Sequence, residues 1–104
     1  IFICFELRFK ELWKMSEGAD VIAIPSWWGV LRTEHFKSFT NTLAIMNQCY
    51  VVASDSLDDE CTKMSGIISP MGDEKRNIDK ASLSIDYNPQ EITKMRKYMD
   101  IGIK

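Results

Sequence analysis

A chain of 104 residues with 45% hydrophobic and 27% charged residues has the composition of a soluble globular domain. Its net charge of -2 provides no long-range attraction for nucleic acid or an anionic membrane, and no apolar run approaches the ~20 residues of a membrane span. Three cysteines, in a chain that is not rich in cysteine, argue against a disulfide framework and favour a reducing compartment. We therefore expect a cytoplasmic protein with no nucleic-acid partner and no membrane partner.

The first half of the chain alternates apolar runs with helix-like segments. Residues 1–3 (IFI) are predicted to end a buried strand, and residues 9–17 to form a helix with Gly18 as its C-cap. Residues 21–24 (VIAI) form a continuous apolar run, which is typical of a strand covered on both faces, and Pro25 ends it.

A second helix is predicted to begin at Thr33, a favourable N-cap residue, and to end near residue 48. Its apolar residues recur at intervals of three and four, which predicts one buried stripe. The stripe consists of Phe36, Phe39, Leu43 and Met46. Residues 50–53 (YVVA) predict another buried strand.

The segments that follow are shorter and more polar. Residues 55–60 are acidic and are predicted to form a loop. Residues 65–69 and the segment that begins at Glu74 are predicted to pair as a hairpin, and the alternation over residues 82–86 predicts a final strand. The basic residues nearby are interrupted by acidic ones, so we expect a solvated surface there. These basic residues are Lys75, Arg76 and Lys80.

The terminal helix has the clearest beginning of any element. Asn88 is a suitable N-cap, Pro89 is favourable at the first helical position, and Glu91 completes a capping-box arrangement. The whole order is β-α-β-α-β, followed by a hairpin, a strand and a terminal helix. This order predicts a layered α/β fold with a mostly parallel first part.

Cys4 is the first candidate for chemistry, because it lies where the first apolar run meets a charged, helix-like segment. A thiol at such a turn can be exposed near backbone N–H groups, and both features favour the nucleophilic thiolate. The alternative is a buried, inert thiol at a strand end. We expect Cys49 to be a packing residue, and Cys61 to belong to a solvated loop rather than to a metal site.

Trp27 and Trp28 follow a predicted strand at its carboxyl end, where α/β proteins build pockets. The two alternatives are substrate binding and ordinary packing, and we expect one tryptophan to line a substrate site while the other packs. His35 is the only histidine of the chain, and a role at a helix surface or pocket rim is favoured over proton transfer.

Residues 4–12 (CFELRFKEL) resemble the nucleophile segment of the nitrilase, or carbon-nitrogen hydrolase, superfamily. Residues 18–26, 43–52 and 65–72 are similar, in the same order, to later segments of that family. The resemblance covers residues 1–86 and implies that residues 1–104 are the carboxyl-terminal portion of one carbon-nitrogen hydrolase domain. The implied fold is a four-layer αββα sandwich.

The resemblance also implies an activity, namely hydrolysis of an amide or nitrile carbon-nitrogen bond through a cysteine thioester. Cys4 would be the nucleophile and the Phe5 backbone N–H an oxyanion donor. The implied partners are a small-molecule amide or nitrile substrate and a second copy of the chain, as a homodimer or larger homo-oligomer. We predict no cofactor and no metal.

The general-base glutamate and the catalytic lysine of the family precede its cysteine, so we expect neither in this chain. Glu6 and Lys10 do not match those roles, and we expect Glu6, Arg8 and Glu11 to brace the turn through ion pairs. We therefore predict no amide hydrolysis by these 104 residues alone. We also predict that the isolated chain associates through an exposed apolar sheet face.

Two departures from the family pattern leave the subfamily open. Lys10 replaces a common proline, while Leu43 and Met46 stand where arginine and glutamate are common. One hypothesis is that the latter two changes are coupled, exchanging a charged pair for apolar packing. The leading interpretation is thus an amidohydrolase, and the alternatives are a catalytically silent folding or interaction module and a small α/β ligand-binding domain.

Overall fold

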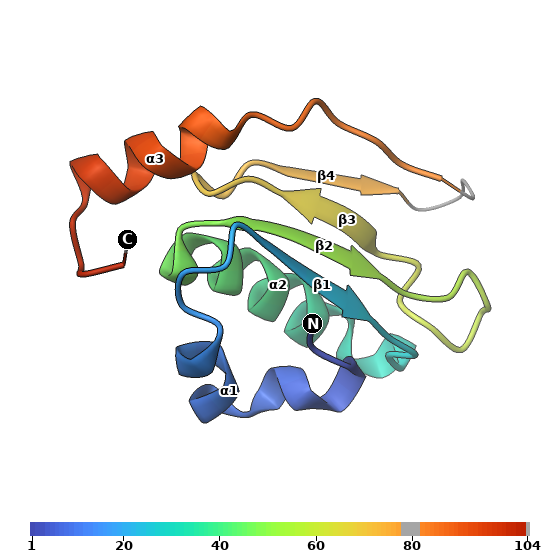
Figure 1. Ribbon diagram of the computed structural model, residues 1–104. Helices are drawn as coiled ribbons and strands as arrows, with labels where there is room; N and C mark the ends of the chain where they lie inside the picture. The colour runs from blue at the N-terminus through green and yellow to red at the C-terminus, as the bar shows by residue number, and fades with distance from the viewer. Residues whose placement is uncertain (78–81, 104) are drawn as a thin grey trace.

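The computed structural model describes residues 1–77 and 82–103, and its centre is a four-stranded sheet with the strand order β1-β2-β3-β4 (Figure 1). The strands are β1 (Val21–Pro25), β2 (Tyr50–Ser54), β3 (Ser65–Ile68) and β4 (Glu74–Asn77). β1 and β2 are parallel, with Ile22 opposite Val51, whereas the β2–β3 and β3–β4 pairs are antiparallel. The predicted parallel start and hairpin are confirmed.

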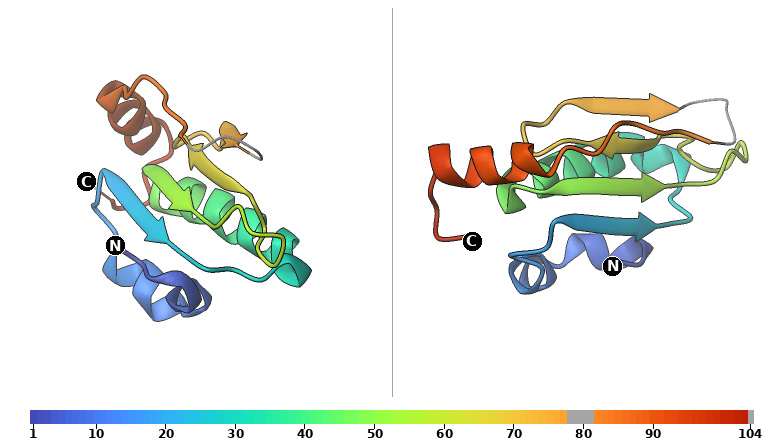
Figure 2. Two further views of the ribbon diagram at one scale, coloured as in Figure 1. Left: turned by 90° about the vertical axis from the view of Figure 1, so that its right-hand side faces the viewer. Right: turned by 45° about the horizontal axis from the view of Figure 1, so that its top comes forward.

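The helices are the 3-10 helices η1 (Cys4–Arg8) and η2 (Val30–Arg32) and the α-helices α1 (Lys10–Met15), α2 (Thr33–Asn47) and α3 (Pro89–Tyr98). α2 provides the crossover between the parallel strands and packs against one face of the sheet (Figure 2). α3 lies at the end of the sheet where β2 begins (Figure 2). A hydrogen bond holds it there, since the hydroxyl of Tyr50, the first residue of β2, donates to Glu91 of α3 at 2.5 Å. No helix among the described residues has the length and apolar character needed to cross a membrane.

The main core lies between α2 and the sheet. Alternate residues of β1, Ile22 and Ile24, face the helix, and Phe36 and Leu43 of α2 are fully buried against the same cluster. Burying a side chain of this size contributes about 1.5–3 kcal/mol. Met46, by contrast, is 55% exposed, so the predicted stripe is wrong at its last member.

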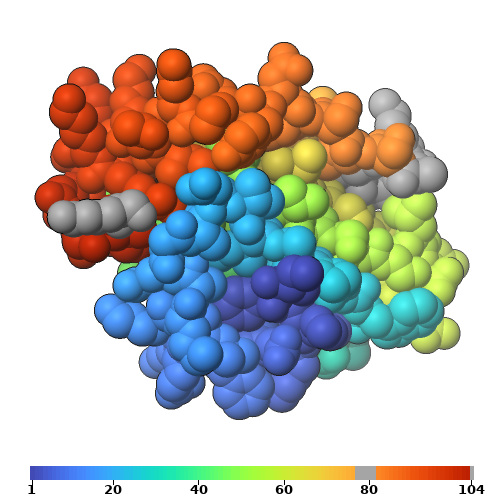
Figure 3. Space-filling model, in the orientation of Figure 1, coloured from blue at the N-terminus to red at the C-terminus, as the bar shows by residue number. Residues whose placement is uncertain are grey.

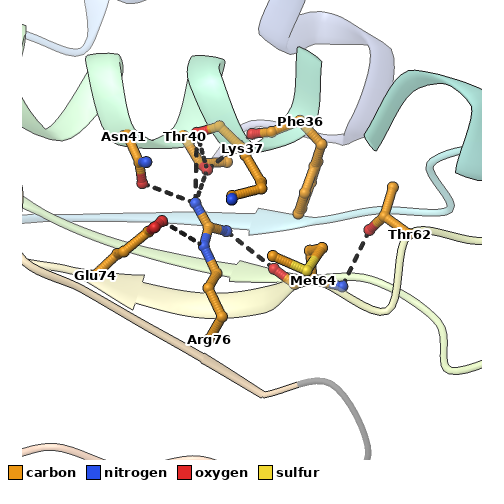
Figure 4. Close-up of polar contacts among 8 residues, drawn as sticks. All are labelled: Phe36, Lys37, Thr40, Asn41, Thr62, Met64, Glu74 and Arg76. Carbon is orange, nitrogen blue, oxygen red and sulfur yellow. Dashed lines mark hydrogen bonds and ion pairs between the residues drawn. The ribbon is translucent and has the colours of Figure 1, made fainter. Parts of the chain in front are cut away.

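The prediction that Arg76 belongs to a solvated surface is wrong, because its side chain is only 7% exposed. The guanidinium reaches from β4 to α2, where Nη2 donates to Thr40 Oγ1 at 2.7 Å and to Asn41 Oδ1 at 2.8 Å (Figure 4). Nε also donates to Glu74 Oε2 at 3.0 Å, and Nη1 to the Met64 carbonyl at 2.9 Å. Arg76 therefore ties the edge strand to the helical layer. Lys80 lies outside the described residues.

Two predicted strands are wrong. Residues 1–3 run beside β1 without joining it as a strand, and the Phe2 N–H donates to the Ala23 carbonyl at 2.9 Å. The chain then turns away at Cys4. The N-terminal end lies on the molecular surface (Figure 3), with Ile1 90% exposed, whereas Phe2 is buried in the core. Residues 82–86 are irregular coil although their sequence alternates.

The predicted bounds of α2 and the predicted beginning of α3 are confirmed to within one residue, whereas α1 is shorter than predicted and its C-cap is Ser16 rather than Gly18. Gly18 has the left-handed φ of +94° expected after α1. Thr33 is the first residue of α2 rather than its cap, and its hydroxyl donates to the Val30 carbonyl at 2.6 Å. Asn88 caps α3 by accepting a hydrogen bond from the Gln90 N–H at 3.1 Å.

Candidate functional site

The turn at Cys4 is unusual in its backbone. Cys4 has a φ of +47°, in the left-handed region that side chains other than glycine rarely adopt. Strain of about 1–2 kcal/mol is ordinary for such a residue and must be offset by its surroundings. Glu6 supplies one offsetting contact, since its carboxylate accepts a hydrogen bond from the Ile3 N–H at 2.8 Å. The sequence segment thus folds into a braced turn with the cysteine at its first residue.

The thiol of Cys4 is partly buried and lies in a pocket of about 560 Å³. Its Sγ donates to the Trp27 carbonyl at 3.5 Å, so the turn and the loop after β1 meet at the sulfur. The pocket is lined by Cys4, Phe5, Arg8, Trp27, Trp28, Gly29, Arg32 and His35. The structure therefore brings all four predicted site residues to one cavity.

The two tryptophans differ sharply in their environments. Trp27 is 60% exposed on the pocket rim, whereas Trp28 is 3% exposed and packs on Phe36 with ring centroids 5.6 Å apart. The Trp28 indole N–H donates to the Arg32 carbonyl at 2.9 Å. Trp28 is therefore a fixed wall, and Trp27 is free to contact a bound molecule.

The Phe5 ring packs on a neighbouring ring, whereas the Phe5 backbone N–H is the predicted oxyanion donor. The exposed ring packs edge-to-face on Phe9, with centroids 5.7 Å apart. Phe5 is the second residue of η1, and N–H groups at the start of a helical turn have no intrahelical acceptor. This N–H is adjacent in the chain to the Cys4 sulfur, as an oxyanion donor would need to be.

Arg8 and His35 line the same pocket and contact each other. The Arg8 guanidinium lies 5.1 Å from the Trp28 ring centroid and 5.4 Å from that of Phe39, and its Nη2 is 3.0 Å from His35 Nδ1. Because a guanidinium can only donate, His35 Nδ1 accepts and the ring proton is assigned to Nε2. His35 lies at the pocket rim, as predicted.

The predicted ion pairs around this turn are wrong. Among residues 1–77 and 82–103, no ion pair joins Glu6, Arg8 or Glu11. Glu6 braces the turn through a backbone N–H instead, and Arg8 is held by aromatic faces and a histidine. Aromatic rings are polarisable partners for a guanidinium and attract it by cation–π interaction.

Asp55 is the residue that the sequence interpretation missed. It lies in the predicted acidic loop, which gives no sign of a role for it, yet it is buried and accepts a hydrogen bond from the Trp28 N–H at 2.8 Å. A signal was present, because Asp55 directly follows β2 at the carboxyl edge of the sheet, where α/β proteins place site residues.

The other two cysteines are buried and have unreactive environments. Burial raises the pKa of Cys49 to about 11, and burial together with the nearby Asp55 carboxylate raises the pKa of Cys61. Cys61 is thus packed rather than part of a solvated loop, because its backbone pairs with Gly29. The described part of the chain contains no group of three or more His, Cys, Asp or Glu residues that could hold a metal ion.

Comparison with known proteins gives several matches, although no protein-family model matches the chain. The 2-oxoglutaramate amidase of Bacillus subtilis (strain 168) is 37% identical over 76 residues, which are 67% of this chain and 29% of the relative. A protein named hydrolase in agr operon, from Staphylococcus aureus, is 28% identical over 107 residues, covering 95% of this chain and 41% of the relative. The chain thus spans less than half of the length of these curated relatives.

Solved structures show the same fold. The C. elegans NitFhit protein superposes with a TM-score of 0.77 at 23% identity, over 97% of this chain and 27% of that one. Saccharomyces cerevisiae Nit3, a member of branch 10 of the nitrilase superfamily, has a TM-score of 0.74 at 19% identity, over 96% of this chain and 41% of that one. The α/β sheet and its helices therefore have the fold of nitrilase-type proteins. Together with the sequence relatives, these matches show that the chain is a relative of the nitrilase superfamily.

Proposed function

We propose that the chain is the carboxyl-terminal portion of a carbon-nitrogen hydrolase domain that hydrolyses small amides or nitriles, with Cys4 as the nucleophile. The observation that carries the proposal is the Cys4 turn, where a residue with φ +47° presents a partly buried thiol to an aromatic-lined pocket. Strained backbone at a pocket is common where a reactive side chain must be aimed. The names of the curated relatives, an amidase and a hydrolase, support the same class of reaction.

In the proposed reaction on an amide, a base removes the Cys4 proton and Sγ bonds to the carbonyl carbon. The carbonyl electron pair moves to oxygen, where the Phe5 N–H donates to the oxyanion. A preorganised donor of this kind is often worth about 3–4 kcal/mol. The C–N bond then breaks, the departing nitrogen takes a proton, and water hydrolyses the resulting thioester to the acid and the free thiol.

The base and the oxyanion lysine of this proposal come from sequence that precedes this chain, as the family resemblance implies. The Glu6 carboxylate, two residues from Cys4, is engaged by the Ile3 N–H. Without a base, no group takes the Cys4 proton as Sγ attacks the carbonyl carbon. The 104 residues alone are therefore proposed to be inactive in turnover, although Cys4 can still form a covalent adduct.

The pocket favours an amide that carries an acid group. The Arg32 guanidinium lines the cavity and lies over Gly29, where an added Cβ would be 3.0 Å from Nη2. Trp27 offers an exposed apolar wall on the same rim. A carboxylate at the far end of the substrate could therefore contact Arg32, which agrees with a relative named for 2-oxoglutaramate.

The assembly and location belong to the proposal as well. We propose a homodimer or larger homo-oligomer, as expected from the resemblance. We also propose a cytoplasmic location, because an odd number of free cysteines favours a reducing compartment.

The first test is acyl transfer from an activated p-nitrophenyl ester to the 104-residue chain, followed by peptide mass spectrometry. We expect one acyl group on the Cys4 peptide and none on it in Cys4→Ser. Equal acylation of Cys49 or Cys61 would contradict a privileged nucleophile.

The second test measures ammonia release from 2-oxoglutaramate, simple aliphatic amides and nitriles. We expect release by a longer polypeptide that contains this chain and its preceding sequence, and none by its Cys4→Ser variant. Turnover by the 104-residue chain would refute the need for preceding residues. Absence of turnover in the longer polypeptide would favour the catalytically silent module.

A further inference from the structure

Asp55 joins two loops through a single buried carboxylate. Oδ1 accepts from the Trp28 N–H at 2.8 Å, and Oδ2 accepts from the Thr62 N–H at 2.9 Å and from the Thr62 hydroxyl at 2.5 Å. Hydrogen bonds to an ionised acceptor are about twice as strong as those between neutral groups. The Oδ1 bond therefore links the loop after β1 to the loop after β2, and the Oδ2 bonds fix the carboxylate within the loop after β2.

The two loops are also paired along their backbones. Gly29 and Cys61 form an antiparallel bridge, and the Val30 N–H donates to the Glu60 carbonyl at 2.8 Å. The Thr62 N–H also approaches the Trp28 carbonyl at 3.2 Å. This pairing places Asp55 inside the junction, where its carboxylate is shielded from water.

Trp27 is held on both sides by consecutive residues at the end of β2. The preceding residue, Ser26, donates from Oγ to the Ser54 carbonyl at 2.6 Å, and the following residue, Trp28, donates to Asp55. The Trp27 carbonyl between these two anchors accepts from Cys4 Sγ at 3.5 Å. The Trp27 carbonyl and the Trp28 N–H belong to the same planar peptide unit, so moving the Trp28 N–H also moves the Trp27 carbonyl.

We propose that Asp55 is a positioning residue for the Cys4 site, which fixes the Trp27 carbonyl and thereby the direction of the thiol. The inference rests on the proposed function, in which Cys4 is the nucleophile. Asp55 does not touch the sulfur, so its effect passes through the Trp27–Trp28 segment. The same segment carries the exposed Trp27 wall, so Asp55 also sets the shape of the rim.

The test compares the alkylation rate of Cys4 by iodoacetamide across pH in Asp55→Asn, Thr62→Val and the wild-type chain, with peptide mass spectrometry and thermal unfolding in parallel. Asp55→Asn keeps the shape but places a donor amide among three donors. Thr62→Val removes one of these donors but keeps the Asp55 carboxylate. An effect of this variant therefore reports the position of the carboxylate rather than the loss of its charge. Asp58→Asn is the matched control, because Asp58 is exposed in the same loop.

We expect Asp55→Asn and Thr62→Val each to raise the rate at Cys4 by about threefold or more near neutral pH, since the thiol is no longer held as a donor to the carbonyl. Asp58→Asn should match the wild type. A lower melting temperature with an unchanged Cys4 rate in Asp55→Asn would overturn the inference and leave Asp55 a purely structural residue.

Should Asp55→Asn fail to fold, Thr62→Val decides, and an unchanged Cys4 rate in that folded variant also overturns the inference. Alkylation requires no amide turnover, so the outcome is separate from that of the proposed function. A changed rate at Cys4 together with an inactive longer polypeptide would refute the hydrolase and retain the positioning role.

Discussion

The Arg76 side chain of β4 lies directly across Gly66 of β3, where a Cβ on the glycine would come within 2.5 Å of Arg76 Cδ. Gly66 and Arg76 are paired in the antiparallel register of the two strands. The missing side chain is thus what allows the arginine to cross the sheet and reach Thr40 on α2. A glycine usually weakens a strand, and here it is required by this close approach.

The first prediction is that Gly66→Ala destabilises the chain by about 1–3 kcal/mol through overpacking against the arginine stem. Urea unfolding measures this change. In an Arg76→Ala background the same substitution should cost much less, because the clashing atoms are gone. Equal costs in both backgrounds would show that the clash is not the cause.

The second prediction concerns acid stability. Partial burial raises the pKa of Glu74, but hydrogen bonds from Arg76 and Asn41 outweigh this effect and hold the pKa below its usual value. A carboxyl with a lowered folded-state pKa contributes stability above its unfolded value, and that contribution is lost as the pH falls through the folded value. Unfolding free energy should therefore fall on acidification below about pH 4.5, and less steeply in Glu74→Gln. Parallel curves for the two proteins would contradict the link.

The third prediction distinguishes two residues of α2. Leu43 is fully buried, so Leu43→Ala should destabilise the chain by about 2–5 kcal/mol. Met46 is more than half exposed, so Met46→Glu should change stability by less than about 0.5 kcal/mol. That result would reject the hypothesis that the two residues are a coupled apolar replacement of a charged pair. A large loss in Met46→Glu would support the coupling.

The fourth prediction concerns Cys49, whose pKa burial raises from 9.0 to about 11. The unfolded thiol ionises first as the pH rises, so folding stability should decline between about pH 9 and 11. Cys49→Ala should remove that part of the decline, which chemical denaturation at several pH values can measure. An identical alkaline decline in this variant would assign it to other groups.

The fifth prediction is that the chain associates in solution. Val21 of β1 and Val52 of β2 are exposed on the sheet, and Ile1 and Ile3 are exposed beside it. Exposed apolar side chains on a sheet favour association. Light scattering should give a mass that rises with concentration, and Val52→Lys should reduce it. A monodisperse monomer at every concentration would disprove this expectation.

Much of the fold could be predicted from local sequence. The apolar run of β1 predicts its strand, and Asn88 with Pro89 predicts the beginning of α3, because these signals act between neighbouring residues. Residues 82–86 alternate like a strand but are coil, since a strand also needs a partner to take its backbone hydrogen bonds. Sequence pattern alone does not reveal whether such a partner is present.

Within the candidate site, the sequence determined which segment bears the proposed nucleophile, because a short motif around Cys4 specifies the turn locally. Tertiary structure decided which side chains surround that thiol. Trp27 meets Cys4 from 23 positions away, and Arg76 meets Thr40 from 36 positions away. Asp55 lies in a predicted acidic loop and Arg76 on a predicted solvated surface. The side chains of both are nevertheless buried, because folding brings hydrogen-bond partners that compensate the loss of water. Such compensation depends on distant residues, so it is absent from any local pattern and exists only in the folded chain.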